Sequence, residues 1–349
     1  MSPGTPIPSV ARLVWIGARL APVAWLTARA TLARAGLERV VLHVEAPLVG
    51  PPPLDGDALA DDLRRAGVQV VPFQLDDLID ASGLTSAESG RLRGLGRDLR
   101  QGAARSNLAR LLILNAEGGI YLDTDAPPLR ALTPLLQHRA CLGLERVALP
   151  LRTMASRSPI RWARAGALLA WRELCSHGDL GERLGERTAN LFDLAVNNAV
   201  IGAAPGSELL VSALQTAAAL PDEVARERYQ LGPKLLERVT GNRSGPEVEI
   251  LPPEVCYPFG PELSWHLFRP RPQPRQSRDA LAGEALLQLL PSACRVVHLY
   301  DSVLRRRQGC SLDGAWLDRH RDDTIVGALL APYVDELCAL DPGRADVAR

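Results

Sequence analysis

The segment NAEGGIYLDTDAP, Asn115–Pro127, carries the clearest structural signals in this 349-residue chain. The pair Gly118–Gly119 predicts the end of a helix, because glycine readily takes the left-handed conformation of a helix C-terminus. The apolar run Ile120–Leu122 predicts a short buried strand, which puts Asp123 and Asp125 at its carboxyl end. Open α/β sheets bind ligands at that edge. The stretch therefore predicts a helix, a core strand and an acidic strand-end site in succession.

The two aspartates predict a cation site. In an extended segment both side chains point the same way, with Thr124 opposite. Converging carboxylates without a basic neighbour repel each other, and a divalent cation relieves the repulsion; oxygen ligands suit Mg²⁺ or Mn²⁺, which bridge to phosphates. A second DxD, at Asp55 and Asp57, precedes a helix in a Pro-rich loop and is typical of helix capping. The strand-end position distinguishes the first pair from the second.

A polar cluster lies on the helix before the strand, which the sequence predicts from about Arg97 to Glu117. Ser106 and Asn107 come four and three residues before Arg110, so all three share one helical face. On a helix that leads the chain to a metal site, such a cluster indicates more than a solvated face, and the spacing leaves open whether it binds a ligand.

The first third of the chain alternates apolar runs with helical periodicity, which predicts βαβ units and a largely parallel sheet. The elements expected there are strands at Arg12–Gly17, Arg39–Glu45 and Val68–Phe73, a helix at Pro22–Gly36 and a Gly/Ser-rich stretch at Ala81–Gly96. Those expected later are helices at Ala163–Cys175 and Pro221–Val239, a strand within Asn197–Gly206 and a strand at Arg295–Tyr300.

The composition excludes several classes of protein. Formal net charge is zero, and the arginines are interspersed with carboxylates, so nucleic acid is not an expected partner. The six cysteines lack zinc-ligand spacing. No signal peptide or apolar run long enough to span a bilayer is visible, which predicts a soluble, cytoplasmic protein without a transmembrane segment.

The sequence SNLARLLILNAEGGIYLDTDAPPL, Ser106–Leu129, resembles the signature of glycosyltransferases with a sugar-binding region containing DxD. These are glycosyltransferase family 32 and, more distantly, the clostridial glucosylating toxins. Four more segments resemble the family's motifs in the family's order: IPSVARLVWIG (7–17), NNAVIGAAPGSELL (197–210), LGPKLL (231–236) and VVHLYDSV (296–303).

The resemblance implies an α/β protein of the GT-A class, with a Rossmann-like, mostly parallel central sheet flanked by helices and additional helices in the C-terminal half. It implies one domain over residues 1–349, with a nucleotide-sugar half at about 7–145 and an acceptor and sugar-pocket half at about 146–340. The implied activity is metal-dependent, retaining transfer of a hexose from a UDP- or GDP-hexose donor to an acceptor that the sequence leaves open.

The resemblance also implies roles for individual residues. Asp125 would be a direct ligand of Mn²⁺ or Mg²⁺, and Asp123 would hold the metal, the ribose or both. Trp15 would stack on the nucleotide base, the alternative being a core tryptophan. Arg110 would contact the sugar or its phosphate, and the remaining donor-site residues would be Ser106, Asn107, Tyr121, Asn197 and Asn198.

The C-terminal motif implies a further metal ligand. His298 would lie near the metal and diphosphate, the alternative being a core histidine. Asp301 and Ser302 would compete as oxygen ligands, and Arg305–Arg307 would form a cationic lid where the family's Ser-Trp pair is replaced by Ser302 and Val303.

Asn107 stands where the family usually has aspartate, which keeps a non-catalytic nucleotide-sugar-binding protein open as an alternative. A phosphatase of the haloacid dehalogenase type is a second alternative. Lys234 and the pair Asp322–Asp323 fit it loosely, whereas Ala126 and Pro127 after the second aspartate do not.

Overall fold

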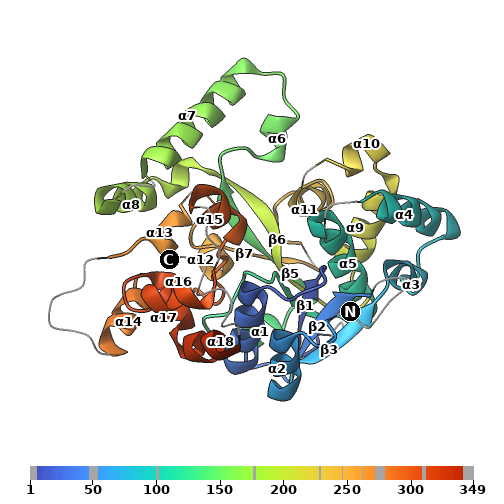
Figure 1. The fold of residues 1–349 in the computed structure, drawn as a ribbon. Coiled ribbons are helices and arrows are strands. Elements are labelled where there is room, and N and C mark those ends of the chain that lie inside the picture. The colour runs from blue at the N-terminus through green and yellow to red at the C-terminus, as the bar shows by residue number, and fades with distance from the viewer. Residues whose placement is uncertain are drawn as a thin grey trace. The chain divides into compact units, whose positions relative to one another are not determined.

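The computed structural model describes residues 6–46, 54–99, 102–175, 178–227, 229–245, 247–261, 263–271, 280–308 and 312–340 (Figure 1). The chain divides into two compact units. Unit 1 is Met1–Gly143 with Val196–Leu251, and unit 2 is Leu144–Ala195 with Pro252–Arg349.

A seven-stranded sheet forms the centre of unit 1, in the order β3-β2-β1-β4-β6-β5-β7. Its strands are β1 (Val10–Trp15), β2 (Arg39–Glu45), β3 (Gln69–Phe73), β4 (Gly119–Leu122), β5 (Ala140–Val147), β6 (Asp193–Ala203) and β7 (Glu249–Leu251). The β1–β2, β2–β3, β1–β4 and β5–β7 pairs are parallel, and β6 runs antiparallel to β4. The mostly parallel α/β sheet predicted from the sequence is confirmed.

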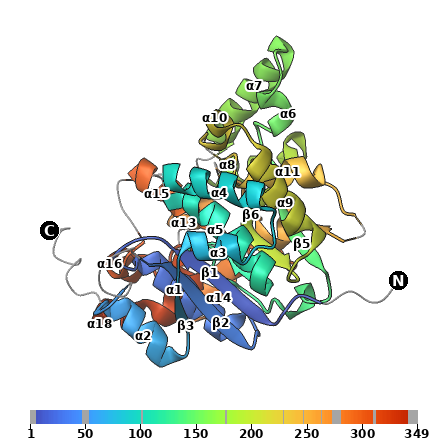
Figure 2. The same ribbon diagram turned by 90° about the vertical axis from the view of Figure 1, so that its right-hand side faces the viewer.

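Helices cover both faces of the sheet. Those of unit 1 are α1 (Pro22–Arg34), α2 (Ala58–Ala66), α3 (Leu75–Asp80), α4 (Ser86–Asp98), α5 (Gly102–Glu117), α9 (Glu208–Ala219), α10 (Asp222–Ala225) and α11 (Pro233–Thr240), with a 3₁₀ turn at Thr133–Leu135. In Figure 2, α4, α5 and α9 gather on one side of strands β1–β3, and α1 and α2 lie on the other. The crossovers therefore wind to both faces, as in doubly wound α/β sheets.

Unit 2 is mainly helical, which confirms the predicted additional helices. Its helices are α6 (Leu151–Met154), α7 (Pro159–Cys175), α8 (Gly178–Arg187), α12 (Pro253–Cys256), α13 (Trp265–Phe268), α14 (Ala280–Leu287), α15 (Asp301–Gln308), α16 (Gly314–Arg319), α17 (Ile325–Leu330) and α18 (Val334–Leu340), with 3₁₀ turns at Ala189–Leu191 and Ala331–Tyr333.

The local signals around β4 act as predicted. Gly118 and Gly119 have φ of 63° and 119°, and β4 begins directly after α5 ends. Ile120, Tyr121 and Leu122 are each at most 1% exposed. The predicted capping role of the other DxD is confirmed for Asp57, whose side chain accepts a hydrogen bond from the Ala60 amide at the start of α2.

Most of the Gly/Ser-rich stretch, for which no helix or strand was predicted, is helix α4, which a Thr85–Glu88 capping box initiates. Three expectations were wrong. The next helix begins at Gly102 instead of Arg97. The expected helix Pro221–Val239 is broken into α10 and α11, because Tyr229, with φ of 69°, and Gly232, with ψ of −119°, are both non-helical. The apolar run Arg295–Tyr300 is largely buried, yet it forms a single bridge at Val296 and no strand.

Candidate functional site

The acidic pair lies at the carboxyl end of β4, where the sheet is expected to bind ligands. The Ala126 amide donates to the Asp123 carbonyl at 2.9 Å, so Asp123–Ala126 form a turn. Both carboxylates are partly exposed. The extended geometry expected for Thr124 and Asp125 was wrong: the turn places Asp125, and the two-residue alternation of a strand does not apply to it.

Asp123 is held by two side chains of unit 1. The Tyr121 hydroxyl donates to Asp123 Oδ1 at 2.6 Å, and Arg110 Nη2 lies 2.9 Å from the same oxygen. Burial raises the pKa of Tyr121 well above its ordinary value, so the phenol stays neutral and donates. The assumption that the aspartates lack a basic neighbour was wrong, because Arg110 supplies a positive charge from α5.

Arg110 joins three elements of unit 1. Its side chain is buried, and it donates to the Asn198 carbonyl on β6 at 2.7 Å and to the Ser106 hydroxyl at 3.2 Å. The guanidinium lies 4.4 Å from the centre of the Tyr121 ring. The polar cluster on α5 is therefore part of a hydrogen-bonded network that fixes Asp123, and its role in ligand binding stays a prediction.

An amide pair extends this network. Asn198 Nδ2 donates to Asn107 Oδ1 at 2.7 Å. A Cβ at Gly232 would lie 2.8 Å from Asn198 Nδ2 and 2.9 Å from Asn107 Nδ2, so the chain before α11 packs closely on the pair. Asn197 points to the opposite face of β6, as alternation requires, and its Oδ1 accepts from the Ala199 amide at 2.7 Å. The structure thus brings Asn198, and not Asn197, to Asn107.

Trp15 lies at the carboxyl end of β1, the parallel neighbour of β4, and so at the same edge of the sheet as Asp123. Its side chain is half-buried, and its indole Nε1 donates to the Arg19 carbonyl at 3.0 Å. In contrast, Trp25 on α1 is fully buried. Trp15 is therefore not a core tryptophan, and its stacking on a base stays a prediction.

His298 belongs to unit 2, where it is half-buried. Its ring packs on those of Tyr257 and Tyr300, with centroid distances of 5.9 and 3.9 Å. Arg305, from the predicted lid, pairs with Asp301 at 2.7 Å, and the side chains of residues 303 and 306–308 lie outside those described. A role for His298 and the arginines near the aspartates stays a prediction.

Two features of the site were not predicted from the sequence. The first is the packing of Gly232 against the two amides. The sequence indicated it only weakly, through a Gly-Pro pair before a helix. The bond between Arg110 and Asp123 had a better signal, since both residues were already selected, but their sequence separation hid the contact.

Fold and site define an α/β protein with an acidic, internally braced site at the carboxyl edge of its sheet. Residues 59–142 match the family model described as "Glycosyltransferase sugar-binding region containing DXD motif". The match agrees with the resemblance found in the sequence, and it covers 84 residues of this chain. The mostly parallel sheet flanked by helices is the arrangement that the resemblance implied. The polar cluster of α5 and both aspartates lie within the matched residues.

Solved structures with detectable similarity include three glycosyltransferases. "PaToxG Glycosyltransferase" is 15% identical with a TM-score of 0.44, over 68% of this chain and 70% of that one. Mouse xyloside xylosyltransferase 1 is 14% identical with a TM-score of 0.40, over 72% and 87%. An active-site mutant of LgtC is 15% identical with a TM-score of 0.40, over 95% of each chain. No curated protein sequence matches.

Proposed function

We propose that this chain is a metal-dependent, retaining glycosyltransferase that transfers a hexose from a nucleotide-sugar. The observation that carries the proposal is the bracing of Asp123 by Tyr121 and Arg110, with Asp125 in the turn that follows, inside the matched DXD region. If Asp123 served only in a structural ion pair with Arg110, a second carboxylate at the carboxyl end of β4 would not be needed.

The residues present fit a hard divalent cation. Asp123 and Asp125 offer carboxylate oxygens, which Mg²⁺ and Mn²⁺ prefer. The contacts of Asp123 with Tyr121 and Arg110 both use Oδ1, which leaves Oδ2 to serve as a ligand. When bound, such a cation would neutralise the charge that develops on the departing nucleoside diphosphate.

The chain's own residues would position the donor. Trp15 offers a half-exposed ring at the same sheet edge, and stacking of a base on such a ring contributes ~1–3 kcal/mol. The Asn107–Asn198 pair would hydrogen-bond sugar hydroxyls, because each amide can both donate and accept. The aromatic ring would thus bind the base of the nucleotide-sugar, and the amide pair would bind its sugar.

Retention of anomeric configuration would follow from substitution on one face of the sugar. The leaving phosphate would accept the proton of the acceptor hydroxyl while the new bond forms, and Arg110 would hold Asp123 in place throughout. The acceptor would be a glycan, a lipid-linked sugar, a protein or a secondary metabolite.

The test is a screen of UDP-, GDP- and TDP-sugars with Mn²⁺, by thermal shift and then by product analysis. The proposal expects a metal-dependent rise in melting temperature with one nucleotide class and slow release of the nucleoside diphosphate. Release of inorganic phosphate would instead identify a phosphatase, and stabilisation by donors without turnover on any acceptor would identify a binding protein.

A further inference from the structure

Unit 2 carries a strongly basic segment in a chain of zero net charge. The 27 residues from Arg146 to Arg172 contain six arginines and no acidic residue. Two of these arginines are partly neutralised by one carboxylate, since Arg152 and Arg164 both pair with Asp193. Arg157 and Arg161 are exposed and form no ion pair within the described part of the chain. The positive charge is therefore concentrated around the turn that joins α6 to α7.

Large apolar side chains are exposed around the same turn. Met154, Ile160 and Trp162 are 41%, 79% and 45% exposed, and every residue of Pro159–Arg164, the start of α7, is exposed. The Trp162 indole Nε1 donates to the Ser156 carbonyl at 2.9 Å, which holds the ring against the turn. The side chains that would ordinarily be buried in a core lie here among arginines.

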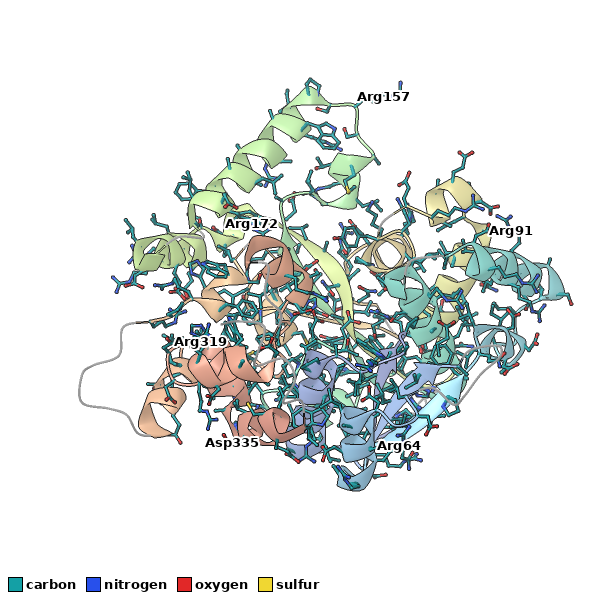
Figure 3. The ribbon with its side chains drawn as sticks, viewed as in Figure 1. Arg64, Arg91, Arg157, Arg172, Arg319 and Asp335 are labelled. Atoms are coloured by element: carbon teal, nitrogen blue, oxygen red, sulfur yellow. The ribbon has the colours of Figure 1, made fainter. Side chains whose placement is uncertain are left out.

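The far part of α7 is anchored, in contrast to its start. Leu168 packs in a buried cluster with Ala148 and Phe192, and the Arg172 guanidinium lies 5.0 Å from the centre of the Phe192 ring. Figure 3 labels Arg157 at the turn before α7 and Arg172 toward the other end of that helix. Leu168 lies nine residues after Pro159, a rise of about 14 Å along the helix, so the start of α7 lies more than two turns from the buried cluster.

We propose that the patch formed by Met154, Arg157, Ile160, Arg161 and Trp162 docks on an anionic membrane surface. Tryptophan and aliphatic side chains enter the headgroup region, while arginines pair with anionic lipid headgroups. No helix of the described ranges has the length and apolar character to cross a bilayer, so the contact would be peripheral. An acidic protein would satisfy the arginines equally well, but three bulky apolar residues around one exposed turn favour insertion into lipid.

The proposal does not depend on the glycosyltransferase activity, because its test measures binding of the full chain. The protein is sedimented with vesicles of phosphatidylcholine alone and of equal parts phosphatidylcholine and phosphatidylglycerol. We expect binding to the anionic vesicles that falls as salt is raised, and little binding to the neutral ones. Each basic residue near an anionic surface contributes about fivefold in partitioning, so Arg157→Glu with Arg161→Glu should weaken binding by at least ~25-fold.

Matched variants separate a specific patch from general charge. Arg243→Glu with Arg319→Glu makes the same change in net charge at exposed arginines elsewhere and should leave binding within about threefold, since the patch keeps its own arginines. Ile160→Ser should weaken binding, and Leu289→Ser, at a residue 49% exposed, should not. Equal sedimentation with both vesicle types, or an unchanged affinity of the Arg157 and Arg161 double variant, would overturn the proposal; binding of acidic proteins but not of vesicles would assign the patch to a protein partner.

Discussion

At the scale of single residues, the site is built by a network that fixes one carboxylate. Tyr121 and Arg110 both engage Oδ1 of Asp123, and Arg110 in turn is held by Ser106 and the Asn198 carbonyl. Buried hydrogen-bonded charges of this kind are costly to break, because a lost partner leaves the other charge uncompensated. The network therefore gives Asp123 a fixed position, whereas Asp125 takes its position from the turn.

Replacing Trp15 by alanine should weaken binding of the matching nucleoside diphosphate by roughly ten- to a hundredfold, the loss expected for one stacked base. The fold should survive, because the side chain is half-buried at the end of β1 and not in the core. Calorimetric titration of the nucleotide, with the melting temperature as control, measures both.

Trp162→Ala is the matched variant, since that ring is 45% exposed and lies in unit 2. Its nucleotide affinity should equal that of the wild type. A Trp15 variant that binds the nucleotide normally would remove the stacking role.

Replacing Gly232 by alanine should disturb the amide pair. The new Cβ would lie within 3 Å of both side-chain amides, which forces the Asn107–Asn198 hydrogen bond to lengthen or break. We expect a donor KM raised about tenfold, equivalent to one hydrogen bond of ~1.4 kcal/mol, with kcat changed less. Steady-state kinetics with the donor varied tests this.

Asn107→Asp provides the comparison, because a carboxylate can still accept from Asn198 Nδ2. It should change the ranking of donors and keep the fold. An Asn107→Asp enzyme with uniformly higher activity on every donor would mean that the asparagine is a weakened version of the family's aspartate and not a specificity determinant.

At the scale of elements, the junction of α5 and β4 depends on backbone space as well as on conformation. Gly118 and Gly206 have nearly the same φ, 63° and 60°. A Cβ at Gly118 would lie 2.6 Å from Pro205 Cδ and 2.9 Å from Pro8 Cδ, whereas a Cβ at Gly206 would meet nothing within 4 Å. The two glycines therefore separate the cost of left-handed backbone from the cost of a clash.

Gly206→Ala should lower the free energy of unfolding by about 1–2 kcal/mol, the strain of a left-handed alanine. Gly118→Ala should lower it by a further ~1–3 kcal/mol, because rigid prolines must move. Urea denaturation of both variants measures the difference. If both variants lose the same free energy of unfolding, the backbone at Pro8 and Pro205 moves away from the new Cβ without an energetic cost.

The elements around the site differ in how far local sequence determines them. The helix stop at Gly118, strand β4 and the first βαβ units were predicted correctly, because glycine conformation and hydrophobic period are local properties. The turn at Asp123–Ala126 was missed, since a strand pattern does not show where pairing with β6 ends. The run at Arg295–Tyr300 was misassigned because burial alone produces the same apolar pattern as a strand.

At the scale of the whole molecule, a buried histidine should make unit 1 sensitive to acid. His43 on β2 is 2% exposed, and its Nε2 lies 3.2 Å from Arg12 Nη1. Burial, and secondarily the charge of Arg12, lowers the pKa of His43 to about 3. Below about pH 6.5, the unfolded chain therefore binds a proton at His43 that the native state does not bind.

Stability should accordingly be highest above pH 6.5 and fall as the pH is lowered toward 3. From pH 7.5 to 5 the contribution of His43 amounts to about 2 kcal/mol. His43→Gln keeps a hydrogen-bond acceptor for Arg12 but does not titrate, so its free energy of unfolding should fall less over the same range. If the free energy of unfolding of the wild type and of His43→Gln falls by the same amount over this range, His43 does not contribute to acid sensitivity.

Asp123 and Asp125 are the residues that we propose to form a metal-dependent nucleotide-sugar site. The most direct measurement is the release of nucleoside diphosphate from the preferred nucleotide-sugar, with Mn²⁺ and with EDTA, by the wild type, Asp125→Ala and the matched variant Asp55→Ala. Asp55 belongs to the capping DxD and is exposed.

We expect release that requires Mn²⁺ and that is unchanged in Asp55→Ala. In Asp125→Ala it should fall on the order of a thousandfold, which corresponds to about 4 kcal/mol of lost transition-state stabilisation. Release that persists in Asp125→Ala and in EDTA would show that the aspartates hold no catalytic metal.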